Sequence, residues 1–315
     1  MKTYLIRRIV GAFIVMWAVA TLVFVMMRLV PGDPLAAMLF DTADPDMIEE
    51  LRRQYGLDDP IYVQYFKWFW QVLQGNLGAS IYGSRTPVWT IISEAFPRTL
   101  SLATLGFIFA LVIAVPAGLI SAIRKHTPLD HAVTVFAFIG LSMPDFWLAI
   151  LLIIVFAANL QVLPAIGYVP MSEGLWPWFS HIVLPAFAIG VGFAAIITRM
   201  IRSSMLEILK TDYMRVAHAK GLTEFRILVR HGFPNALIPV LTVMGIALAL
   251  LMAGAVVVEN VFAIKGLGRV LIEGILNRDY PVVQGAIIAV SAIFVFANLI
   301  VDLLYAVIDP RIRYE

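Results

Sequence analysis

Six long apolar runs dominate this chain and limit what it can fold into. They lie at about 9–29, 99–123, 131–158, 181–200, 236–258 and 282–307. A helix of roughly 20 residues, rising about 1.5 Å per residue, crosses the hydrocarbon core of a bilayer. None of the runs shows the strict alternation of a membrane β-strand. With 61% hydrophobic and only 14% charged residues, the sequence predicts an all-α integral membrane protein with six transmembrane helices.

Lysine and arginine residues predict how these helices are oriented. They gather in four of the segments that flank the runs, at Lys2, Arg7, Arg8, Arg124, Lys125, Arg199, Arg202, Lys210, Arg215, Lys220, Arg226, Arg230, Arg311 and Arg313. With six spans, all four segments lie on one side, which the positive-inside rule makes cytoplasmic, together with both termini. The segment 30–98, on the other side, holds nine acidic and five basic residues. The first run is too long for the core of a signal peptide, so we expect it to be a retained anchor.

The spans divide the chain into four parts. Residues 1–30 form an N-terminal transmembrane helix, 31–98 an extracytoplasmic interfacial segment, 99–308 a core of five membrane helices, and 309–315 a cytoplasmic tail. Within the core, residues 201–235 form a cytoplasmic loop and residues 259–281 an outer loop. The absence of cysteine excludes disulfides and thiol chemistry.

Aromatic residues crowd into the outer segment. One short helix can start at Asp44-Pro45 and a second at Asp59-Pro60. The second carries Tyr62, Tyr65, Phe66, Trp68, Phe69 and Trp70. Aromatic rings prefer the membrane interface, so we expect this helix to lie there and to pack against the outer ends of the spans. A docking surface for an external protein is the alternative.

A charged insert, Asp212 to Pro239, separates the fourth and fifth spans. Asp212 can cap a helix and Gly221 can end it. A second helical stretch can then start at Glu224 and lead into the fifth span. An ordinary basic loop would serve only to fix topology, whereas a built helical pair would serve to meet a soluble partner.

Motifs in the insert and along nearly the whole chain decide between these alternatives. In the insert they are Asp212-Tyr213, Ala217, Ala219-Lys220-Gly221, Arg230-His231, Asn235-Ala236 and Pro239. Elsewhere they are Arg7-Arg8, Leu29–Pro34, Tyr55–Asp58, Ser142–Trp147, Val258–Phe262, Gly266–Arg269, Arg278–Val282 and Asp309–Arg313. Together they resemble the membrane permeases of binding-protein-dependent ABC importers, in the branch that carries dipeptides, oligopeptides, nickel and glutathione. His218 stands where that pattern often has arginine.

The resemblance implies a type I ABC importer permease fold and a set of partners. These are a second homologous permease, two ATP-binding cassette subunits, an extracytoplasmic substrate-binding protein and membrane lipid, with no nucleic acid. It makes Asp212–Gly221 a coupling helix for the ATPases, with Asp212, Tyr213, Ala217, Lys220 and Gly221 as its contact residues. His231, Asn235 and Pro239 would fix the loop to the fifth span.

No cofactor is expected in this chain itself. It lacks the phosphate loop G-x-x-x-x-G-K-[ST], so ATP and Mg²⁺ would be bound by the partner ATPases. His181 and His231 lack the spacing of a metal motif, and no metal site is expected.

Two further groups of residues are candidate sites. In the outer loop, Phe262, Gly266, Leu267 and Gly268 would contact or probe the binding protein, or else form a turn packed on the surface. Asp145, Asn298 and Asp302 are candidates for the translocation path, because polar groups at membrane depth face protein or water. Helix packing or partner contact is the favoured interpretation of these three.

We therefore predict a non-catalytic permease subunit of a prokaryotic inner membrane that forms half of a translocation path. The resemblance favours a di- or oligopeptide as the substrate. The same machinery carrying a nickel complex, glutathione or another small solute is the alternative. An autonomous ion-coupled carrier would show internal repeats, and no clear duplication is present. An intramembrane enzyme would show a nucleophile with a paired base, and no such set is present.

Overall fold

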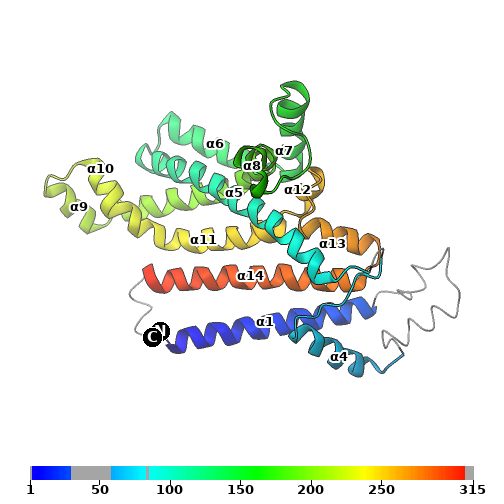
Figure 1. The fold of residues 1–315 in the computed structure, drawn as a ribbon. Coiled ribbons are helices and arrows are strands. Elements are labelled where there is room, and N and C mark those ends of the chain that lie inside the picture. Colours follow the sequence, from blue (N-terminus) through cyan, green and yellow to red (C-terminus); the bar gives the residue numbers. More distant parts are fainter. Residues whose placement is uncertain (1, 30–57, 83–84, 309–315) are drawn as a thin grey trace.

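The computed structural model describes residues 2–29, 58–82 and 85–308, and within them the chain forms helices but no strand (Figure 1). The long helices are α1 (Lys2–Leu29), α5 (Val88–Ile123), α8 (Leu175–Ile208), α11 (Phe233–Gly254) and α14 (Tyr280–Ile308). The shorter elements are α4 (Ile61–Leu73), α6 (Pro128–Ser142), α7 (Asp145–Leu152), a π-helix (Ile153–Asn159), a 3-10 turn (Met171–Glu173), α9 (Asp212–Ala219), α10 (Glu224–Arg226), a second π-helix (Ile227–Gly232), α12 (Val256–Val261) and α13 (Leu267–Leu276).

Five helical stretches in the described residues are long and apolar enough to cross a membrane. They are Ile6–Leu29, Val88–Ile123, Leu175–Ile208, Glu224–Val261 and Tyr280–Ile300. They overlap five of the six predicted spans, but Val88–Ile123 and Glu224–Val261 begin well before the predicted 99–123 and 236–258. The sixth exists if the bent pair Pro128–Ser142 and Asp145–Asn159 is counted as one span.

That third predicted span is broken rather than continuous. Helices α6 and α7 meet at an angle of 100°. The break lies at Met143, which is extended, and Pro144, which caps α7. Proline has no N–H to give to a helix and disfavours the helical conformation of the residue before it. The predicted span over 131–158 is therefore bent rather than straight, and Pro144 is the physical reason.

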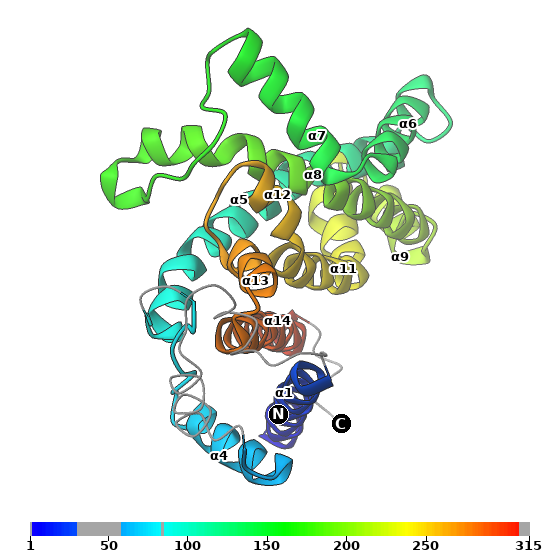
Figure 2. The same cartoon turned by 90° about the vertical axis from the view of Figure 1, so that its right-hand side faces the viewer.

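Helices α5 and α8 form the centre of the packing, and small residues bring them close together. A Cβ on Gly190 of α8 would lie 2.6 Å from the carbonyl oxygen of Gly106 on α5, and a Cβ on Gly118 would lie 2.7 Å from Ile201. Small side chains allow membrane helices to approach in this way. Around this contact the interior is filled by Leu102, Ile182, Ile189, Ile197 and Ile201. Helix α6 packs against α8 and also contacts α5 (Figure 2).

Helix α4 packs against the C-terminal half of α1. The hydroxyl of Tyr65 accepts a hydrogen bond from Nε1 of Trp17 at 3.0 Å and lies 2.7 Å from the hydroxyl of Thr21. The ring of Phe24 lies 5.3 Å from that of Tyr65. The helix begins after Pro60 as expected, and its packing on a span is confirmed. The helix expected after Asp44-Pro45 lies outside the described residues.

A second face of α4 is apolar and exposed. It presents Tyr62, Phe66 and Trp70, which are all more than half exposed. An apolar face beside a membrane helix suits the interfacial position that the aromatic pattern predicts.

The start of α1, the end of α14 and the α9–α10 pair all lie at one end of the bundle (Figure 1). Helix α1 and helix α14 are in contact along their length, and α14 contacts α11 in turn. The charge pattern predicts this arrangement, since the three helix ends adjoin three of the four basic segments that it places on one side.

Candidate functional site

Helix α9 is joined to α8 by a short, hydrogen-bonded link. The backbone N–H of Leu209 donates to the carbonyl of Met205, and that of Thr211 donates to the carbonyl of Ile208. The hydroxyl of Thr211 also donates to Ile208, at 2.6 Å. Because these bonds continue from α8 almost to the first residue of α9, the two helices are connected without a flexible spacer.

The ends of α9 are set by Thr211 and Gly221. Thr211 is the N-cap and Asp212 is the first helical residue, so the expectation that Asp212 itself caps the helix is wrong by one position. Its charge still suits the first turn of a helix. At the other end Gly221 has φ +72°, a conformation that favours glycine. The predicted glycine turn is confirmed.

The inner face of α9 packs against the base of the insert. Met214 is fully buried, Ala217 is 8% exposed, and both pack with the buried Ile227 of the second π-helix. A Cβ on Gly232 would lie 3.3 Å from Met214. Ala217 therefore faces the chain itself, and its assignment to the ATPase contact surface is corrected: its small side chain lets α9 seat on its own support.

The outer face carries the other four predicted contact residues, since Asp212, Tyr213, Lys220 and Gly221 are all exposed. Asp212 pairs with Arg215 at 3.2 Å, between two well-exposed side chains. His218 lies 3.4 Å from Glu224 at the start of α10.

Two apolar residues of this surface escaped the sequence interpretation. Val216 is 53% exposed and Phe225 is 76% exposed. Val216 lies one turn after Tyr213, on the same side of α9. Phe225 stands out as an aromatic residue in a charged stretch, and that contrast was the available signal.

The three residues expected to anchor the loop lie on the side of the insert toward α11. The side-chain amide of Asn235 donates to the carbonyl of His231 at 2.8 Å. His231 is half-buried, and Pro239 is exposed inside α11. The contact with α9 is made by Ile227 and Gly232, so anchoring by His231, Asn235 and Pro239 stays a prediction.

The outer turn between α12 and α13 is held inward by Glu259. One carboxylate oxygen accepts from the hydroxyl of Thr99 at 2.6 Å, and the other accepts from the backbone N–H of Arg269 at 3.1 Å. A Cβ on Gly266 would overlap this carboxylate. A Cβ on Gly268 would lie 2.6 Å from the backbone of Val256.

This arrangement affects the predicted probing loop. Phe262 and Leu267 are buried, at 1% and 0% exposure. Their side chains do not reach outward in this conformation, contrary to the expectation of a turn that extends into a cleft. A contact of Gly266 and Gly268 with a binding protein stays a prediction.

The candidate path residues lie in different places. Asp145 begins α7 at the break, and a Cβ on Gly192 of α8 would lie 3.5 Å from its carboxylate. Beside it is a pocket of about 430 Å³, lined by Ile139, Ser142, Met143, Pro144, Phe146 and Trp147. The amide of Asn298 donates to the carbonyl of Phe294 on its own helix at 2.9 Å. Asp302 lies outside the residues whose side chains are described.

No group of three or more His, Asp or Glu side chains that could hold a metal ion occurs in the part of the chain that the structure describes.

A helical membrane core with a short, exposed helical pair at one end is typical of a membrane subunit that contacts a partner outside the bilayer. Two family models agree with this class. Residues 114–314 match the binding-protein-dependent transport system inner membrane component, and residues 1–103 match the N-terminal part of such membrane components. The chain belongs to this family.

Relatives of known name cover the whole chain. It is 41% identical over 314 residues to the probable peptide ABC transporter permease protein y4tP of Sinorhizobium fredii, and 39% identical over 315 residues to the glutathione transport system permease protein GsiC of Escherichia coli. Each match covers 100% of both chains.

Among solved structures, a chain of the MetNI methionine ABC transporter, in an inward-facing crystal form, has the same fold. The match has a TM-score of 0.59 at 19% identity and covers 70% of this chain and 96% of that one. The fold is thus that of a type I ABC importer permease, as predicted. The chain is a membrane subunit of a transport system and not an enzyme. Membership of the family implies ATPase and substrate-binding partners and a place in the inner membrane.

Proposed function

We propose that this chain forms half of the translocation path of an ATP-driven importer of di- or oligopeptides. The relative named as a peptide permease, alike over its full length, supports the peptide substrate. The relative named as a glutathione permease supports glutathione, itself a small peptide, as the second candidate. A nickel complex or another small solute would use the same machinery.

The observation that carries the proposal is an exposed apolar tip of the α9–α10 pair, formed by Val216 and Phe225, above a buried base formed by Met214 and Ile227. Val216 and Phe225, the latter at the very start of the Glu224–Val261 stretch, present apolar surface at the end of the bundle, next to the charges of Arg215 and Lys220. An exposed apolar group rimmed by polar residues is typical of a protein contact. Because Met214 and Ile227 are buried beneath it, the tip can pass a displacement to the membrane helices.

The geometry is compatible with the following set of partners. The α9–α10 pair contacts one of two ATP-binding cassette subunits, which hold ATP and Mg²⁺, on the cytoplasmic side with both termini. A second homologous permease completes the path. A binding protein docks on the opposite side, over the outer segment and the 259–281 loop. The arrangement of the helix ends in Figure 1 supports this orientation.

Within the membrane, Asp145 is the candidate path residue that the structure favours. Its carboxylate lies at the break between α6 and α7, where the helix backbone is interrupted. Broken helices near charged groups are a common feature of transport paths. Asn298 bonds to its own helix, and together with Asp302 it is the weaker candidate.

Co-purification tests the coupling surface. The tagged chain is expressed with its neighbouring genes, and the ATPase recovered per chain is measured for Phe225→Ser. We expect recovery to fall, because the substitution removes the most exposed apolar group of the tip. Leu276→Ser is the matched control, since Leu276 is also 76% exposed but ends α13 at the other end of the bundle. Equal recovery from both variants would contradict the proposed contact.

Uptake tests the substrate. Complexes reconstituted in vesicles with their binding protein are given labelled dipeptide, and unlabelled oligopeptide, glutathione or nickel is added as a competitor. Peptide import that requires ATP and resists glutathione and nickel supports the first candidate. Absence of dipeptide import, together with ATP-dependent import of labelled glutathione in a parallel assay, would replace it by the second.

A further inference from the structure

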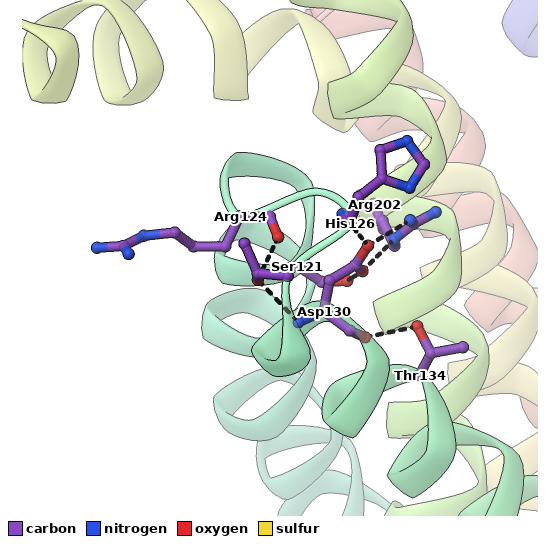
Figure 3. A network of polar contacts seen from close by, with 7 residues as sticks. Ser121, Arg124, His126, Asp130, Thr134 and Arg202 are labelled. Carbon is purple, nitrogen blue, oxygen red and sulfur yellow. Dashed lines mark hydrogen bonds and ion pairs between the residues drawn. The ribbon is translucent and has the colours of Figure 1, made fainter.

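A buried ion pair joins the α5–α6 turn to α8 (Figure 3). Arg202 donates hydrogen bonds to both carboxylate oxygens of Asp130, from Nε to Oδ1 at 2.8 Å and from Nη2 to Oδ2 at 2.8 Å. The side chain of Asp130 is only 3% exposed and that of Arg202 is 30% exposed. A bidentate contact of this kind fixes the relative orientation of the two side chains as well as their distance.

Asp130 also holds the turn that precedes its own helix. Its carboxylate accepts a hydrogen bond from the hydroxyl of Ser121 on α5 and another, at 3.0 Å, from the backbone N–H of His126. His126 has φ +64°, a conformation that non-glycine residues adopt only when their surroundings hold it. One carboxylate thus ties together the end of α5, the turn and the start of α6, and Arg202 adds α8.

Arg202 stands close to the coupling surface along the chain. It lies on the last two turns of α8, and α9 begins at Asp212 after the hydrogen-bonded link described above. One turn beyond Arg202, the fully buried Met205 lies against Gly232 together with Met214 of α9. A force on α9 therefore reaches Arg202 through packed, bonded groups.

Other close contacts within the α5–α6–α8 unit are between apolar groups. Gly118 meets Ile201, and Gly140 of α6 lies against Val191. Contacts between apolar membrane helices have no hydrophobic drive to hold one register, because lipid is as apolar as the side chains. The Asp130–Arg202 pair supplies the directional bond at the end of the unit nearest α9.

We propose that Asp130 and Arg202 are positioning residues for coupling, which make the α5–α6 turn move with α8 when an ATPase displaces α9. The inference rests on the proposed function. Without the pair, α8 shifts along α5 and α6, and ATP hydrolysis no longer drives the path between its states.

The experiment uses the full complex, with the binding protein, reconstituted in vesicles. Peptide uptake per ATP hydrolysed is measured for Arg202→Lys, which keeps the charge but loses the bidentate hydrogen bonds, and for Asp130→Asn. The double variant Asp130→Asn/Arg202→Met removes both charges and so leaves no buried charge unpaired. Arg199→Lys is the matched control, since Arg199 lies one turn earlier on α8 and its guanidinium lies 5.4 Å from the centre of the Phe138 ring of α6.

We expect complexes of all four variants to retain their ATPases. Uptake per ATP should fall about fivefold or more in the three pair variants, the lower end of typical coupling strengths, and stay near wild type in Arg199→Lys. Uptake per ATP that is normal in the assembled fraction of the pair variants would show that the pair only supports folding, and would overturn the inference. A wild-type chain that purifies without ATPases would instead contradict the proposed function, and the inference with it.

Discussion

The hydroxyl of Thr99 on α5 connects this helix to two residues of the distant α12–α13 segment. It donates to the buried carboxylate of Glu259 at 2.6 Å and accepts from the backbone N–H of Leu267 at 2.8 Å. Thr99 is itself 1% exposed. One side chain therefore fastens both ends of the outer turn to a membrane helix.

Replacing Thr99 by valine should destabilise the protein. The change keeps the shape but leaves Glu259 with one donor fewer and Leu267 with an unpaired N–H, at a cost of about 1–3 kcal/mol per unsatisfied group. We expect a lower melting temperature of the purified protein in mild detergent. Thr104→Val, on an exposed position of the same helix, should melt like wild type. Equal melting of the two variants would mean that the Thr99 bonds contribute nothing.

The packing of α4 against α1 depends on the hydroxyl of Tyr65. Tyr65→Phe removes the partner of Trp17 and Thr21 but keeps the stacked ring, which lies 5.7 Å from that of Phe69. Hydrogen bonds between membrane helices average about 0.6 kcal/mol, so we expect a small loss of stability and faster protease cleavage between residues 58 and 82. Tyr62→Phe, on the exposed face, is the control and should change neither. Identical cleavage of both variants would contradict the role of the hydroxyl.

The features that the sequence predicted correctly are those that depend on local sequence properties. Run length and hydropathy are local properties, and the positions of five spans followed from them directly. The turn at Gly221 followed from another local property, the preference of glycine for the position after the end of a helix. The angle at Pro144 did not, because a proline predicts a break but its neighbours decide how far the two halves separate.

Burial of single residues was harder to predict. Ala217 is small enough for either face of α9, and only the position of Ile227, ten residues later, places it inside. Arg202 counted in the sequence as one of many basic residues that set topology. Its partner Asp130 is 72 residues away, and no local pattern joins the two.

The two faces of α9 predict opposite phenotypes for the same substitution at neighbouring positions. Val216→Asp places a charge on the exposed tip, so the chain should accumulate normally but recover several-fold less ATPase. Ala217→Asp buries an unpaired charge against Met214 and Ile227, so the amount of folded chain itself should fall. Chain level and ATPase recovery, measured in the same purification, separate the two effects. Val216→Asp with a lowered chain level and normal recovery per chain would show that the faces are assigned the wrong way round.

Gly221 offers the sharpest test of the turn, because its environment separates backbone strain from crowding. A Cβ at this position would meet nothing within 4 Å, yet its φ of +72° disfavours most side chains. Gly221→Val should therefore cost about 1 kcal/mol or more in the local turn, whereas Gly221→Asn should be tolerated, because asparagine adopts the left-handed region far more readily. We expect the valine variant to insert and assemble but to transport less peptide per ATP, and the asparagine variant to stay close to wild type. If the two variants lose coupling equally, an added side chain of any kind is harmful, and the surface at Gly221 is then itself in contact with the ATPase. If neither loses coupling, the direction in which the chain leaves α9 does not matter for transport.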